Sequence, residues 1–101
     1  MAERPEHAKA REHLGEVYAM WGQQLANSHN DEQAALRYQD ALQYRPDDVE
    51  VRIRLGMTFA RMERLNESQA EFEAVLRLKP DSLLARQAIE AIVKRKQATG
   101  K

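Results

Sequence analysis

The chain has 101 residues, and its 16 basic and 16 acidic side chains give a formal net charge of zero. This length fits one domain, and the balanced charge provides no overall field that would attract nucleic acid or an anionic membrane. No stretch approaches the roughly 20 apolar residues of a membrane span, no apolar signal segment opens the chain, and the absence of cysteine excludes disulfides and thiolate chemistry.

The first predicted element is a helix from about Pro5 to Ala26. Pro5 suits a first helical turn, and the cluster from Asn27 to Asp31 contains residues that end helices. Gly15 is the weak point of this helix. It is either a tolerated helical glycine, which we favour, or a joint between an N-terminal extension and the first repeat helix. Side chains at three- and four-residue steps form its apolar stripe, which comprises His7, Ala8, Ala10, Leu14, Val17, Tyr18, Trp21 and Leu25.

Four further helices are predicted from apolar periodicity and from the two later prolines, Pro46 and Pro80, because the residue before a proline leaves helical geometry. Their ranges are 31 or 32 to 45, 48 to 62, 66 to 79, and 82 to about 98. Inward positions of the fourth helix are Phe72, Val75, Leu76 and Leu78.

Helix starts are predicted from capping residues. Asp47 and Asp81, which follow the two prolines, can each cap the next helix and favour its positive end. Asn30 with Gln33, and Asn66 with Gln69, each resemble a capping box. The spacing of these two boxes conflicts with the spacing of the two prolines, so one of the two cap assignments is wrong by two residues.

Eight positions of the first half recur in the second half at one fixed offset, which is the offset from Pro46 to Pro80. Tyr18, Trp21, Gly22, Leu25, Ala34, Tyr38, Ala41 and Pro46 correspond to Arg52, Leu55, Gly56, Phe59, Ser68, Phe72, Val75 and Pro80. This period and this order of residue types resemble the tetratricopeptide repeat, whose units are about 34 residues long. The resemblance implies one all-α domain over residues 1–101, built of antiparallel helix pairs in a short right-handed α-solenoid. Residues 15–48 and 49–82 would be two repeats, 1–14 an N-terminal extension of the first helix, and 83–98 a capping helix.

Packing inside such a helix pair explains the repeated glycines. Gly22 and Gly56 lack a side chain and would let the partner helix approach closely. Small residues at Ala34, Ala41 and Ser68 would serve the same approach from the other side. The large residues expected to fill the core are Trp21, Leu25, Tyr38, Leu55, Phe59 and Phe72.

Catalytic and metal-binding patterns are weak, so we expect no enzyme activity, no metal and no cofactor. His7 and His13 are about 120° apart on a helix, away from a common metal-binding face, and solvated histidines are the better interpretation. The carboxylate pair of Glu12 and Glu16 is typical of an exposed helix face. The basic run 94–96, with Lys101, is better explained as a stabilised helix end than as a nucleic-acid or lipid contact.

The family resemblance implies a concave groove lined by the first helix of each repeat, where a segment of another protein would bind. The groove residues that we predict are Met20, Gln23, Asn27, Ile53, Arg54, Met57, Arg61 and Gln87, and a wider set adds Glu16, Ala19, Glu50, Leu84, Ala88 and Lys94. Three of them are apolar residues that the core does not claim, and two arginines share one face. The alternative is an ordinary solvated helix face.

The predicted function is a cytoplasmic, non-enzymatic scaffold that binds an acidic or apolar peptide or helix of a partner protein, without nucleic acid. Family members that bind chaperone tails hold a carboxylate with a clamp of Lys, Asn and Arg side chains. The corresponding positions here carry Ala19, Gln23, Arg54, Leu84 and Ala88, so that mode is disfavoured. The alternative function is self-association, in which an exposed end packs on a second copy or the N-terminal extension enters a neighbour's groove.

Overall fold

The computed structural model describes residues 5–99, which form five helices and no strand. The helices are α1 (Pro5–Asn27), α2 (Asp31–Tyr44), α3 (Val49–Arg61), α4 (Leu65–Leu78) and α5 (Leu83–Thr99). Every helix boundary agrees with the sequence prediction to within one residue, which confirms the all-α class. Residues 1–4 of the predicted extension and Lys101 of the basic run lie outside the described residues.

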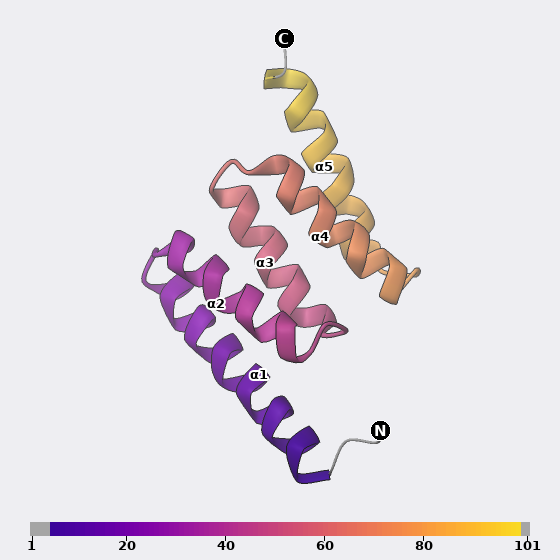
Figure 1. Ribbon diagram of the computed structural model, residues 1–101. Coiled ribbons are helices and arrows are strands. Elements are labelled where there is room, and N and C mark those ends of the chain that lie inside the picture. Colours follow the sequence, from indigo (N-terminus) through magenta and orange to yellow (C-terminus); the bar gives the residue numbers. More distant parts are fainter. Residues whose placement is uncertain (1–4, 100–101) are drawn as a thin grey trace.

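Each helix packs on its neighbours in the sequence, so that the array is elongated, with extents of 52 × 31 × 20 Å (Figure 1). The most extensive contacts lie within the pairs α1 with α2 and α3 with α4. A Cβ atom added to Gly22 would lie 2.8 Å from Cδ1 of Tyr38, and one added to Gly56 would lie 2.7 Å from Cε2 of Phe72. The predicted close approach at both glycines is therefore confirmed.

Gly15 has a specific packing role. Helix α1 continues through it, so the alternative of a joint at this position is wrong. Gly15 is buried because the side chain of Arg45 lies across it, and an added Cβ would be 2.7 Å from Cδ of that arginine. The glycine is thus more than a tolerated helical residue, since it makes room for the arginine that ends α2.

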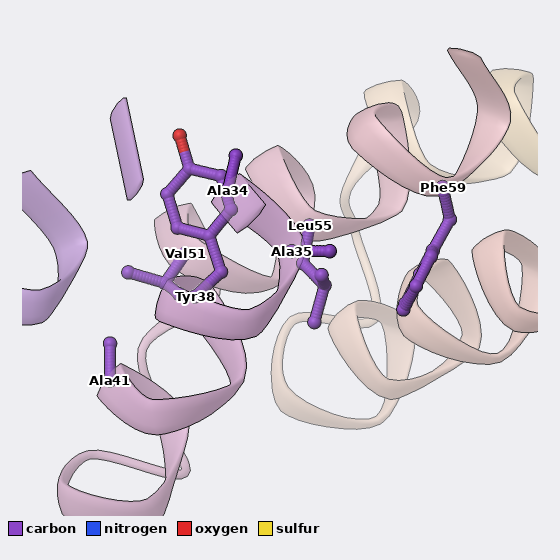
Figure 2. Close-up of a cluster of buried hydrophobic side chains, with 7 residues drawn as sticks. All are labelled: Ala34, Ala35, Tyr38, Ala41, Val51, Leu55 and Phe59. Atoms are coloured by element: carbon purple, nitrogen blue, oxygen red, sulfur yellow. The ribbon is translucent and has the colours of Figure 1, made fainter. Parts of the chain in front are cut away.

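The core consists of two apolar clusters. The first lies between α2 and α3 and comprises Ala34, Ala35, Tyr38, Ala41, Val51, Leu55 and Phe59 (Figure 2). The second joins α4 to α5 and comprises Phe72, Val75, Ala85 and Ile92. Alanines and one serine at the helix crossings keep the backbones close, while the aromatic rings fill the remaining space.

Two predicted core residues lie at the surface. The side chain of Trp21 is 46% exposed and that of Leu78 is 40% exposed, so the prediction that they face inward is wrong. Trp21 stacks on the ring of Tyr18 at a centroid distance of 6.2 Å, and the guanidinium of Arg37 lies 4.6 Å from the Trp21 ring centroid. Tyr18 and Arg37 cover part of the Trp21 ring. The rest is exposed, because no helix of the described chain packs on the outer face of α1.

The caps of α3 and α5 differ from the sequence prediction but keep the repeat period. Asp48 accepts a hydrogen bond from the backbone N–H of Val51 (3.2 Å), and Ser82 accepts one from that of Ala85 (3.2 Å). Asp47 and Asp81 are therefore not the caps, which lie one residue further along. The residue directly after each proline still belongs to the turn. The next residue is therefore the one whose side chain reaches the free backbone N–H groups at the start of the helix.

The starts of α2 and α4 resolve the conflict between the two capping boxes. The N-cap residues are Asn30 and Arg64, which are separated by the same offset as the two prolines, and neither side chain makes a cap hydrogen bond. The predicted cap at Asn66 is wrong by two residues. His29 and Glu63 precede these caps with left-handed φ angles of 62° and 61°, and this conformation closes each preceding helix.

Candidate functional site

A cleft of about 550 Å³ lies between α1 and α3, and Tyr38 of α2 forms part of its lining. Its lining residues are Gln23, Ala26, Asn27, His29, Tyr38, Glu50, Ile53, Arg54, Met57, Thr58 and Arg61. Six of the eight predicted groove residues are among them; the other two, Met20 and Gln87, are not. We call this hollow the central cleft.

Two smaller hollows adjoin the central cleft. The α1 hollow, of about 320 Å³, is lined by Glu16, Ala19, Met20, Gln23, Arg45, Asp48, Glu50, Val51 and Arg54. The α5 hollow, of about 200 Å³, is lined by Met57, Ala60, Phe72, Ala88, Ala91, Ile92 and Arg95. Shared walls make the three hollows one groove, in which Met20 belongs to the α1 hollow and Met57 separates the central cleft from the α5 hollow. Gln87 is exposed on α5 and lines none of the three.

Both arginines of the central cleft are held by carboxylates of the same chain. Nη2 of Arg54 lies 3.2 Å from Oε2 of Glu50, one helical turn away. Nη2 of Arg61 lies 3.0 Å from Oδ1 of Asp31, which begins α2. These two pairs fix the positions of the guanidinium groups and leave the four charges balanced. Helical spacing does not reveal Asp31 as a partner, because it is far from Arg61 along the chain and becomes its neighbour only through the packing of α2 on α3.

The hydroxyl of Tyr38 lies at the inner wall of the central cleft, although the residue is only 1% exposed. It donates to Oε1 of Gln23 over a long distance of 3.5 Å, and Nε2 of Gln23 donates to Oδ1 of Asn27 at 2.9 Å. Burial raises the pKa of Tyr38 above its ordinary value, while the positive charges of Arg54 and Arg61 oppose that rise. The phenol therefore keeps its proton near neutral pH and remains a donor toward the cleft.

Tyr38 was not among the predicted groove residues because its place in the repeat marks it as a core residue. Tyr38 belongs both to the core and to the cleft, since its ring packs against Gly22 and its hydroxyl reaches the cleft. The useful sequence signal was the contrast with Phe72, its counterpart in the second repeat, which has no hydroxyl.

The groove also exposes apolar surface. The side chain of Met57 is 49% exposed and that of Met20 is 64% exposed, while Ile53, which lines the central cleft with Met57, is half-buried. Exposed methionines adapt their shape to different apolar partners. The groove therefore offers flexible apolar contact next to hydrogen-bond donors, an arrangement that fits an apolar side chain followed by an acceptor such as a carboxylate.

The basic run of α5 makes contacts within the chain. Nζ of Lys94 lies 3.8 Å from Oε1 of Glu90, Arg95 pairs with Glu63, and Nζ of Lys96 donates to Oε1 of Gln69 at 2.9 Å. Two of these contacts join α5 to α4 and to the turn before it.

Within residues 5–99, no three His, Asp or Glu side chains are grouped so that they could hold a metal ion. None of the five described helices combines the length and the apolar character that crossing a membrane requires.

Comparison with known proteins supports the repeat pattern. A family model described as tetratricopeptide repeat matches residues 29–94, from the turn before α2 into α5. This match covers more than half of the chain. Among curated proteins, no sequence matches the chain.

Proposed function

Because the chain belongs to the tetratricopeptide repeat family, whose members generally mediate protein–protein interactions, we propose that it is a non-enzymatic scaffold that holds a segment of a partner protein in its groove. The observation that carries this proposal is the composition of the central cleft. Exposed apolar surface at Met57 lies beside the two positioned arginines, Arg54 and Arg61, and the buried hydroxyl of Tyr38. Apolar surface beside a few directed polar groups is typical of peptide recognition.

The partner segment should pair an apolar side chain with a carboxylate. Arg54 donates to Glu50 through Nη2, and Arg61 donates to Asp31 through both Nε and Nη2, whereas the Nη1 atoms of the two arginines have no partner within residues 5–99. A carboxylate of the partner can therefore join these ion pairs instead of displacing them. Because Glu50 and Asp31 balance the two arginines, we expect the acidic group to set register and specificity more than affinity.

The groove allows a segment longer than the central cleft alone. The α1 hollow shares Gln23, Glu50 and Arg54 with the cleft, and the α5 hollow shares Met57 with it. An extended peptide or one face of an amphipathic helix could follow this path across α1, α3 and α5. In this proposal Met20 and Met57 contact apolar residues at different points of the same segment.

A comparative affinity purification tests this function. The variant Arg54→Glu/Met57→Asp alters the cleft, and Arg77→Glu/Leu83→Asp makes the same change of charge at exposed positions outside the groove. We expect quantitative mass spectrometry to find partners that the wild type and the control retain and that the cleft variant loses by about tenfold or more, the effect of about 1.4 kcal/mol. Equal recovery with all three proteins would refute the groove, provided that circular dichroism melts show the cleft variant to be folded.

A random peptide display library tests the chemistry of the segment. We expect selected peptides to carry an apolar residue near Asp or Glu and to bind Tyr38→Phe more weakly than the wild type, because the cleft then lacks one donor. Selection of basic peptides, or binding that is unaffected by Arg54→Gln and Arg61→Gln, would contradict the proposed role of the arginines.

A further inference from the structure

Helix α1 carries a second apolar surface, which is distinct from the groove and from the side that packs on α2. Its residues follow one another at alternating steps of three and four, and we call them the α1 seam: His7, Ala10, Leu14, Val17, Trp21 and Gln24. All six are exposed, and the side chains of Leu14, Val17 and Trp21 are 39%, 42% and 46% exposed. Alternating three- and four-residue steps are the spacing by which two helices pack along a common line.

The repeat shows what this surface does elsewhere in the chain. Val17 and Trp21 correspond to Val51 and Leu55, which are 4% and 0% exposed because α2 covers that side of α3. The next positions at the same offset lie on α5, where Ala85 is fully buried against α4. The α1 seam is therefore a helix-packing surface of the same kind, and within residues 5–99 no helix covers it.

A small hollow on the seam has the form of a socket. It measures about 240 Å³ and is lined by Val17, Met20, Trp21 and Gln24. These residues stand at positions i, i+3, i+4 and i+7, which form the four corners that receive a side chain when helices pack knobs into holes. The surface is thus prepared for the side chain of another helix.

We propose that the α1 seam binds the α1 seam of a second copy of this chain, with the two helices antiparallel. The register with the greatest overlap places Leu14 against the partner's Val17, Ala10 against the partner's Trp21, and His7 against the partner's Gln24. Each large indole then faces a small alanine, the branched residues meet at the centre, and the polar residues lie at the two ends. The seam is in this sense complementary to itself, as a two-fold interface requires.

Charged residues on the exposed side of α5 disfavour a head-to-tail alternative. On α5, Glu90 stands at the repeat position of Gly22 and Gly56, the position that faces a partner helix in the first two repeats. Glu90 and Lys94 are both exposed and form an ion pair at 3.8 Å. Joining this end to the α1 seam would desolvate this ion pair against an apolar surface, and a pair separated by 3.8 Å offsets little of that cost. Association should therefore close at two copies instead of continuing as a filament.

The groove remains open in this dimer. No seam residue lines the central cleft, and only Met20 borders both the socket and the α1 hollow. Each dimer would present two grooves, so it could bind a partner with two suitable segments more strongly than a monomer does. The dimer does not depend on the proposed function of the groove.

Sedimentation of the full chain tests the dimer. The seam from His7 to Gln24 spans only about 26 Å, so the interface is small and we expect a weak dimer that forms between about 1 and 300 µM. We expect Val17→Asp to remain monomeric over that range, while Leu83→Asp, an equally drastic change at a 66% exposed site on α5, dimerises like the wild type. A wild type that stays monomeric throughout, or a Val17→Asp variant that dimerises like the wild type, would overturn the proposal.

Disulfide cross-linking tests the register without disturbing the apolar centre. The chain has no cysteine, so His7→Cys and Gln24→Cys introduce single thiols at the polar ends of the seam. In the antiparallel dimer a mixture of the two variants should form the mixed disulfide, whereas each variant alone should not cross-link, because identical positions would lie about 26 Å apart. Efficient cross-linking of each variant with itself would indicate parallel helices and would overturn the proposed pairing, as would a mixture that forms no disulfide.

Discussion

The strongest test of the helix packing compares the same substitution, Gly to Ala, at Gly56 and at Gly15. At Gly56 the new methyl group would lie 2.7 Å from Cε2 and 3.0 Å from Cζ of Phe72. Carbon atoms prefer separations of at least about 3.5 Å, so the ring or the helix would have to move by about 0.8 Å. Phe72 is 2% exposed and belongs to the second core cluster, and the hydroxyl of Ser68 also holds the carbonyl of Gly56 at 2.7 Å.

The expected magnitude follows from two opposing terms. Overpacking costs about 1–3 kcal/mol, and replacing a helical glycine with alanine returns about 1 kcal/mol. Because Phe72 is buried and Ser68 holds the carbonyl of Gly56, we expect the overpacking cost at this site to lie in the upper part of that range, at about 2–3 kcal/mol. Gly56→Ala should then lower the free energy of unfolding by about 1–2 kcal/mol and the melting temperature by about 4–16 °C. At Gly15 the obstacle is the aliphatic stem of Arg45, whose side chain is 39% exposed and can rotate away. There the propensity gain should prevail, and Gly15→Ala should be neutral or stabilising by up to about 1 kcal/mol.

Thermal and urea unfolding followed by circular dichroism measure both variants against the wild type. Gly15→Ala serves as the matched control, because it makes the same chemical change in a helix of the same array. A melting temperature of Gly56→Ala equal to or above that of the wild type would refute the argument. It would mean that the ring of Phe72 escapes into the α5 hollow, and that the separation of α3 and α4 does not depend on glycine.

Three further experiments test local features. His29→Gly should raise the free energy of unfolding by about 0.5–1 kcal/mol, because glycine adopts the left-handed conformation without steric cost; an unchanged melting curve would contradict this. Asp48→Ala should lower it by about 1 kcal/mol through the loss of the cap to Val51, whereas Asp47→Ala should change it by less than about 0.5 kcal/mol, and a reversed order would restore the original cap prediction. Because burial raises the pKa of Tyr38, the unfolded chain loses that proton first, and the associated stability is complete below about pH 10 and lost above it. Tyr38→Phe should therefore lose less stability than the wild type between about pH 9 and pH 11, and equal losses would argue against a perturbed phenol.

The fold could be predicted from the sequence because its strongest signals are local or periodic. Two prolines and two glycines recur at one common offset, and these residue types are poor choices inside helices unless the packing requires them. Helix ends were therefore predicted to within one residue. The cap residues were less predictable, since Asp47 and Asp48 have equal chemistry and only the path of the turn decides which carboxylate reaches the backbone N–H of Val51.

The groove could be predicted only in outline. Residues on exposed faces of α1 and α3 follow from helical spacing, and the structure places six of them together around the central cleft. The partners that hold them do not follow from spacing, because Asp31 reaches Arg61 only through the packing of α2 on α3. The role of Trp21 was misassigned for a related reason. The counterpart of Trp21 in the second repeat, Leu55, is buried because α2 precedes and covers α3. The periodic pattern does not reveal that no helix of the described chain covers α1 in the same way.

Met57 gives the groove an adjustable partition. Its side chain forms a common wall of the central cleft and the α5 hollow, and it is unbranched, with three rotatable bonds. In the observed conformation it divides two compartments, and a change of rotamer would join them into one longer channel without any movement of the helices. Under the proposed function, this single side chain would set the length of segment that the groove accepts, so partners of different size could share one rigid backbone.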